Sequence, residues 1–180
     1  MAINAHKKRE HGYTLIEMLA TLSVSAILLT LGASALRTYW LTQSLETAEA
    51  ETVAQMRNLQ ERAVSESNPR VYGMRFRVGT SEWGLILFNG GSDPGISDDV
   101  CNQLEIHEFD GVTIEAASFA AAPVVTSKCS SEAWATTSDR FVFFYPRGTA
   151  TAGEVTLHQP SVNKRTEVEV SAMTGRVKTP

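Results

Sequence analysis

Cysteine is scarce in this 180-residue chain, which contains only Cys101 and Cys129. Neither has a second cysteine two residues away, so the sequence offers little support for a zinc site or thioredoxin-like redox chemistry. Both lie in loop-like sequence rich in serine, aspartate and glycine. If this part is exported, a disulfide would close a loop of about 28 residues and stabilise the fold by roughly 3–4 kcal/mol in the chain-entropy model. Two unrelated free thiols remain the alternative.

A surplus of positive charge is also lacking. The chain has 16 basic and 20 acidic residues, a formal net charge of −4. Residues 1–12 contain three of the basic residues and one acidic residue, which leaves 13 basic against 19 acidic residues, a net charge of −6, in the remainder. Phosphate contacts need a positive surface, so this balance argues against nucleic-acid binding by the whole chain. It leaves a local basic patch open.

Patterns typical of catalysis and metal binding are missing as well. No nucleophile motif and no pair of catalytic carboxylates stands out, so we predict neither an enzyme nor a cofactor. Asp93, Asp98 and Asp99 lie in a loop with glycine and proline, but their spacing matches no dedicated calcium loop. We therefore predict no metal site. His107 and His158 fall within strand-like runs and are interpreted as structural or exposed residues.

A long apolar run is present from Tyr13 to Leu36, with Glu17 as its single charge. As a helix rising about 1.5 Å per residue it would be roughly 36 Å long, enough to cross the hydrocarbon core of a membrane. Basic residues 7–9 precede it and acidic sequence follows it. This asymmetry predicts that residues 1–12 lie in the cytoplasm and that the C-terminus lies outside.

Two general explanations of the run leave its carboxylate unexplained. The run resembles a secretory signal with an exit at Ala33-Ser34-Ala35, and equally an uncleaved signal anchor. A carboxylate inside a membrane costs about 2.5–3.5 kcal/mol on insertion scales, so Glu17 indicates a specific partner. A new α-amine on a neighbouring subunit, produced by a cut after Gly12, would be such a partner.

Residues 7–19, Lys-Lys-Arg-Glu-His-Gly followed by Tyr-Thr-Leu-Ile-Glu-Met-Leu, closely resemble the processing site of type IV pilins and type II secretion pseudopilins. The resemblance implies that a prepilin peptidase cuts between Gly12 and Tyr13 and methylates the new amine. It also implies that Glu17 pairs with a neighbour's N-terminus during assembly. Tyr13 replaces the more usual phenylalanine, and the run lacks the proline that many major pilins carry.

The sequence after Arg37 becomes amphipathic and then changes its period to two near Val71. Apolar residues recur at three- and four-residue steps in the first part: Leu41, Leu45, Ala48, Met56, Leu59 and Ala63. We predict one helix over about residues 13–65, ended by Asn68-Pro69. No long helix separates the later strand-like runs, which predicts an antiparallel sheet: 71–78, 83–88, 104–109, 112–116, 141–145, 154–158 and 166–172. The predicted fold class is α+β and pilin-like, with a long N-terminal helix packed on a β-sheet head.

Two segments of the head sharpen the resemblance. Residues 141–157, around Pro146-Arg147-Gly148, resemble the strand–turn–strand hairpin of minor pilins of the GspH/FimT family, and residues 170–178 resemble their C-terminal end. Residues 90–135 match no family pattern. The resemblance implies a cleaved cytoplasmic leader (1–12), a transmembrane and assembly helix (13–36), an amphipathic helix (37–66) and a periplasmic β-rich head (67–180).

The leading prediction is a structural role, as a minor pilin or pseudopilin of the bacterial inner membrane. The subunit would be built into a type IV pilus or a type II secretion pseudopilus, with prepilin peptidase and other subunits as partners. A generic secreted or signal-anchored domain is a minor alternative.

A binding role for double-stranded DNA in natural transformation is the second prediction. In DNA-uptake members of the family, a C-terminal Gly-Arg-x-Arg motif is linked to DNA binding. Gly175 and Arg176 match it, while Lys178 keeps the second positive charge but loses the bidentate fork of arginine. Lys164 and Arg165 are candidates to join this patch, although nearby glutamates oppose it.

Overall fold

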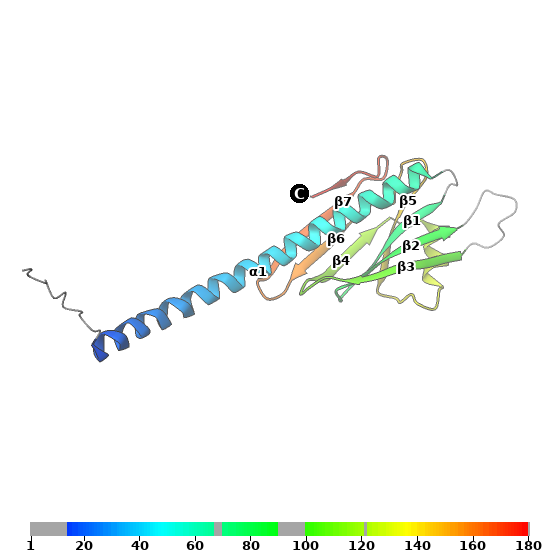
Figure 1. Cartoon of the computed structure of the whole chain (residues 1–180). Coiled ribbons are helices and arrows are strands. Elements are labelled where there is room, and N and C mark those ends of the chain that lie inside the picture. Colours follow the sequence, from blue (N-terminus) through cyan, green and yellow to red (C-terminus); the bar gives the residue numbers. More distant parts are fainter. Residues whose placement is uncertain (1–13, 67–69, 90–99, 121, 180) are drawn as a thin grey trace, which may run out of the picture. The chain divides into compact units, whose positions relative to one another are not determined.

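The computed structural model describes residues 14–66, 70–89, 100–120 and 122–179. Backbone contacts divide the chain into two compact units, Met1–Tyr39 and Trp40–Pro180. One helix, α1 (Leu15–Ser65), runs through both units, close to the predicted range of 13–65. The α+β class is confirmed, with the long helix followed by antiparallel strands (Figure 1).

The first unit consists of the apolar part of α1. Helix-favouring leucine and alanine are frequent here, and this stretch contains no proline to break the backbone hydrogen bonds. Several hydroxyl side chains donate to backbone carbonyls three or four residues earlier: Thr21, Ser23, Thr30 and Ser34. These polar groups are thus satisfied within the helix and need no water, which suits an apolar surrounding.

The second unit begins with the amphipathic part of α1. The predicted stripe is confirmed, with six residues buried on one face: Leu45, Ala48, Thr52, Met56, Leu59 and Ala63. Leu41 is only half-buried. Thr52 is the one polar member of the stripe, and its hydroxyl donates to the carbonyl of Ala48, so its burial leaves no unpaired donor.

The strands form two four-stranded antiparallel sheets, where the sequence predicted one. The first has the order β3-β2-β1-β5 and the second the order β4-β6-β7-β8. Their bounds are β1 Val71–Arg77, β2 Glu82–Asn89, β3 Val100–Glu108, β4 Thr113–Phe119, β5 Asp139–Phe144, β6 Gly153–Gln159, β7 Lys164–Val170 and β8 Val177–Lys178. All seven predicted runs correspond to strands. β8 was not predicted, because its two residues are too few to show an alternating pattern.

A short helix, α2 (Pro123–Ser130), lies in the stretch for which no helix was predicted. Proline at the first turn of a helix loses no hydrogen bond, so Pro123 begins α2 instead of preventing it. Eight residues give too few turns for an apolar period to show in the sequence. A disulfide between Cys101 of β3 and Cys129 of α2 holds the helix against the first sheet.

Two apolar clusters organise the second unit. The larger cluster contains the α1 stripe together with inward-facing residues of both sheets, among them Met74, Trp83, Val155 and Val168. The smaller cluster lies on the other face of the first sheet, where Ile86, Phe141 and Phe143 pack with α2 and the disulfide. The first sheet is therefore buried on both faces, which explains the near-continuous apolar sequence of β2.

Two arginines of β1 join a buried ionic network. Arg75, 1% exposed, pairs with Glu82 and lies 3.6 Å from the carboxylate of Asp139. Arg77 bonds the same two carboxylates, at 2.7 and 3.1 Å, and its hydrogen bond to Asp139 raises the pKa of Arg77 above its ordinary value. Both arginines also donate to the carbonyl of Trp134. The network therefore ties β1, β2 and β5 to the segment that follows α2.

Replacing Met56 with alanine tests the importance of the α1 stripe. Met56 is fully buried, so we expect Met56→Ala to lower the free energy of unfolding by about 2–5 kcal/mol. The neighbouring Arg57 is exposed, so Arg57→Ala should change it by no more than about 0.5 kcal/mol. Urea unfolding of the full chain in detergent micelles, followed by tryptophan fluorescence, measures both. Equal unfolding midpoints for the two variants would contradict the packing of α1 described above.

Candidate functional site

The apolar part of α1 is exposed to an unusual degree. An 18-residue window of it has a mean hydropathy of 1.9, and none of that window is buried within the molecule. The exposed side chains include Leu15 at 79%, Ile16 at 76% and Leu29 at 73%. An apolar surface of this length indicates contact with lipid, with other helices or with both.

Glu17 lies in the first turn of α1, where it has a local structural role. Its backbone N–H donates to the carbonyl of Thr14 at 3.1 Å and to the hydroxyl of Thr14 at 3.3 Å. Thr14 is thus the N-cap and Glu17 the third helical residue, the spacing of a capping box. A carboxylate here also interacts favourably with the helix dipole. The pattern Thr-x-x-Glu is visible in the sequence and indicates this capping role. From the sequence, Glu17 was assigned only to pairing with another subunit.

Gly12 and Tyr13, the predicted processing residues, lie outside the described part of the chain. So do Asp93, Asp98 and Asp99. Among the described residues, no group of three or more histidine, cysteine or acidic side chains is arranged to hold a metal ion. Of the two histidines within the described residues, His107 stacks on Trp83 with ring centroids 4.5 Å apart, and His158 bonds Asn163.

The C-terminal basic segment lies on a turn held by α1. The side-chain amide of Gln60 donates to the carbonyl of Thr174 at 2.8 Å. Gly175 follows with a φ of +59°, a left-handed conformation that favours glycine. Arg176 and Lys178 are both exposed, while Val177 between them is buried. The turn therefore presents both cations to the solvent.

The structure separates the four predicted DNA-binding residues into two groups. Lys164 and Arg165 begin β7, whereas Arg176 bonds Ser171, just beyond the far end of that strand. At about 3.3 Å per residue, the two groups are on the order of 20 Å apart. Arg165 is also engaged, because it bonds Glu115 of β4, two strands away in the same sheet, and this bond lowers the pKa of Glu115.

Arg147 is a further basic residue close to Arg176, and the sequence did not indicate it. It lies in the turn between β5 and β6, beside Gly148, and is exposed. The carbonyl oxygen of Gly148 lies only 3.0 Å from the position a Cβ would take on Gly175. The two turns therefore touch, and they bring Arg147 near Arg176. The sequence motif around residue 147 indicated a hairpin, but nothing in it indicated this contact.

Comparisons with known proteins agree with the N-terminal motif and the fold. Residues 7–33, which include Gly12, Tyr13 and Glu17, match a family model described as the prokaryotic N-terminal methylation motif. The fold is similar to that of the minor pseudopilin EpsH from the type 2 secretion system of Vibrio cholerae. The TM-score is 0.51 at 11% sequence identity, over 76% of this chain and 96% of that chain. A search of curated proteins finds no match.

The chain thus combines an N-terminal methylation motif with an α+β fold similar to that of a minor pseudopilin. A motif of this kind implies processing by a prepilin peptidase and assembly with other pilin or pseudopilin subunits.

Replacing Gly175 with alanine tests the contact between the two turns. A Cβ would lie 2.7 Å from the Gln60 amide nitrogen and 3.0 Å from the Gly148 carbonyl, in addition to the strain of a positive φ. Gly79 has a φ of +85° but open space around it, so Gly79→Ala isolates the strain, about 1–2 kcal/mol. Urea unfolding should show a larger loss for Gly175→Ala. Equal losses would mean that the turns do not constrain each other.

Proposed function

We propose that this chain is a minor pilin or pseudopilin of the GspH/FimT type, a structural subunit of a type IV pilus or type II secretion pseudopilus and not an enzyme. Residues 1–12 are the leader, removed between Gly12 and Tyr13. Residues 13–36 anchor the subunit in the inner membrane and pack in the filament, and residues 37–66 continue the helix. Residues 67–180 form the periplasmic head.

One observation carries the proposal: an apolar helix of membrane-crossing hydropathy, unburied within the molecule, overlaps the methylation motif and begins with a single carboxylate, Glu17. A lone charge in an apolar helix is costly unless it meets a partner. The α-amine of a neighbouring subunit supplies a charge of opposite sign. Pairing with Glu17 then aligns the helices of successive subunits.

Glu17→Gln tests the pairing, and Thr14→Ala is its matched control. The glutamine keeps the length and hydrogen-bonding capacity of the side chain but removes the charge, so we expect normal membrane insertion and leader cleavage and a loss of at least about tenfold in filament incorporation. Thr14→Ala removes the helix cap but keeps the carboxylate, so it should be incorporated normally. Immunoblots of membrane and sheared-filament fractions measure both steps.

The two variants separate the roles of Glu17. Equal defects in Thr14→Ala and Glu17→Gln would mean that Glu17 only stabilises the start of α1. Wild-type incorporation of Glu17→Gln would exclude the charge as a requirement for assembly. Failure of leader cleavage in the wild-type chain would contradict the pilin-like assignment itself.

DNA binding is a second proposed function, favoured by the neighbouring turns that carry Arg147 and Arg176. Two exposed guanidinium groups on touching turns offer the phosphate backbone a local positive surface despite the acidic total. Acidic side chains on the neighbouring strands limit the extent of this positive surface. Glu169 lies opposite Lys178 in the pairing of β7 with β8, and Glu154 lies opposite Glu169 in the pairing with β6.

Titration of a fluorescent DNA duplex with the full chain in detergent micelles tests this function. We expect salt-sensitive binding that Arg176→Ala and Arg147→Ala each weaken, with the slope of log K against log salt falling by about one unit. Lys178→Ala should have a smaller effect because Glu169 offsets its charge, and Lys164→Ala should have none. Absence of binding at low salt, or equal binding by all variants, would exclude the proposed surface.

A further inference from the structure

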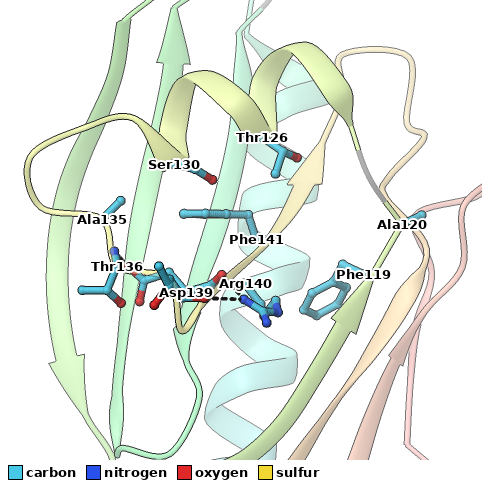
Figure 2. Close-up of a pocket in the computed structure, with 10 residues that line it drawn as sticks. Phe119, Ala120, Thr126, Ser130, Ala135, Thr136, Asp139, Arg140 and Phe141 are labelled. Atoms are coloured by element: carbon cyan, nitrogen blue, oxygen red, sulfur yellow. Dashed lines mark hydrogen bonds between the residues drawn. The ribbon is translucent and has the colours of Figure 1, made fainter.

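A pocket of about 370 Å³ lies in the second unit where β4 and β5, edge strands of the two sheets, approach the end of α2 (Figure 2). Its volume is in the range of small-ligand sites. The wall combines two aromatic rings, hydroxyl groups and charged groups, contributed by Phe119, Thr126, Ser130, Asp139, Arg140 and Phe141. None of the functions considered above uses this pocket.

The backbone of Phe141 leaves a gap in the hydrogen bonding of β5. β5 is the outermost strand of its sheet: β1 pairs with it on one edge, and the other edge has one isolated bridge, between Phe144 and Ala150. On its free edge, Phe143 exchanges bonds with Thr151, and the Asp139 N–H donates to Thr136. Since strand residues alternate, the N–H and C=O of Phe141 point to the same free edge, and no bond to a described residue occupies them. Phe141 is 6% exposed and lines the pocket, so a molecule bound there can supply the partners of this pair.

The charge at the pocket is positive. One terminal nitrogen of Arg140, Nη1, donates to the carbonyls of Thr137 and Asp139 at 3.0 and 2.8 Å, which leaves Nε and Nη2 without a partner among the described residues. Figure 2 shows the guanidinium extending toward Phe119. The carboxylate of Asp139 is already occupied by Arg77 at 3.1 Å and by the N–H of Thr136 at 2.8 Å. An incoming carboxylate would therefore meet a free cation and an already neutralised acid.

We propose that this pocket binds an extended acidic peptide of a partner protein. One peptide residue fits the gap between Asp139 and Phe143 and exchanges backbone hydrogen bonds with Phe141, as in the addition of a strand to a sheet edge. A carboxylate of the peptide pairs with the free nitrogens of Arg140. An apolar side chain next to that carboxylate packs between Phe119 and Phe141. The inference does not depend on the proposed filament or DNA-binding role.

Fluorescence anisotropy of a defined probe tests the proposal with the full chain in detergent micelles. The probe is an N-terminally fluorescein-labelled, C-terminally amidated peptide of sequence Thr-Val-Glu-Phe-Val-Thr. Arg140→Gln should weaken its binding about tenfold or more, because a charge-assisted hydrogen bond is lost. Ser130→Phe, which places a large ring at the pocket wall, should abolish binding. Arg57→Gln is the matched control, since Arg57 is an exposed arginine of α1 outside the pocket, and it should leave binding unchanged.

Changes in the probe separate the two recognition elements. Glutamine in place of the peptide's glutamate should reproduce the loss caused by Arg140→Gln, and methylation of every peptide nitrogen should abolish strand pairing. No saturable binding up to about 1 mM, or binding indifferent to Arg140→Gln, would overturn the proposal. Equal binding of the methylated probe would exclude strand addition. Displacement by 3-phenylpropanoate at the affinity of the peptide would mean a site for small acids instead.

Discussion

The packing of the α1 stripe against the sheets is the contact on which the second unit depends. Residues from Leu45 to Ala63 fill the space between the helix and the inner faces of both sheets, in a cluster that includes the largest buried apolar side chains of β1, β2 and β6. Polar contacts then set the position of the helix along the sheet: Ser44 with Gln159, Glu49 with Thr166 and Gln60 with Thr174. Because apolar packing tolerates sliding more than hydrogen bonds do, these pairs determine the register, and the last of them also holds the turn that carries Arg176.

The same helix has two chemically distinct parts because its surroundings differ. In the second unit the helix is amphipathic, and its own sheets bury one face. In the first unit it is apolar on every side and nothing within the described chain covers it, so its burial has to come from lipid or from other subunits. Folding of the second unit and burial of the apolar part of α1 are therefore driven by the same hydrophobic effect, applied once within the molecule and once against its surroundings.

Much of the fold was predictable because its signals are local. The period of the apolar residues indicated α1 to within two residues, and the seven alternating runs all correspond to strands. The elements that were missed, α2 and β8, are too short for a period to be read. The burial of Arg75 also went unrecognised, since the alternation of β1 suggests one solvated face. That face is covered by α2 and Trp134, and the charge is tolerated because Glu82 and Asp139 pair with it.

The sequence by itself determined the processing motif, the apolar helix and its lone carboxylate, and the α+β class, because each depends on residue type and spacing along the chain. Only the tertiary structure decided which candidate functional groups are neighbours. It separated Lys164 and Arg165 from Arg176, added Arg147 across two touching glycine turns, and left the Phe141 backbone open beside Arg140. These contacts join residues distant in sequence, and their geometry follows from strand register and turn conformation, which no local pattern specifies.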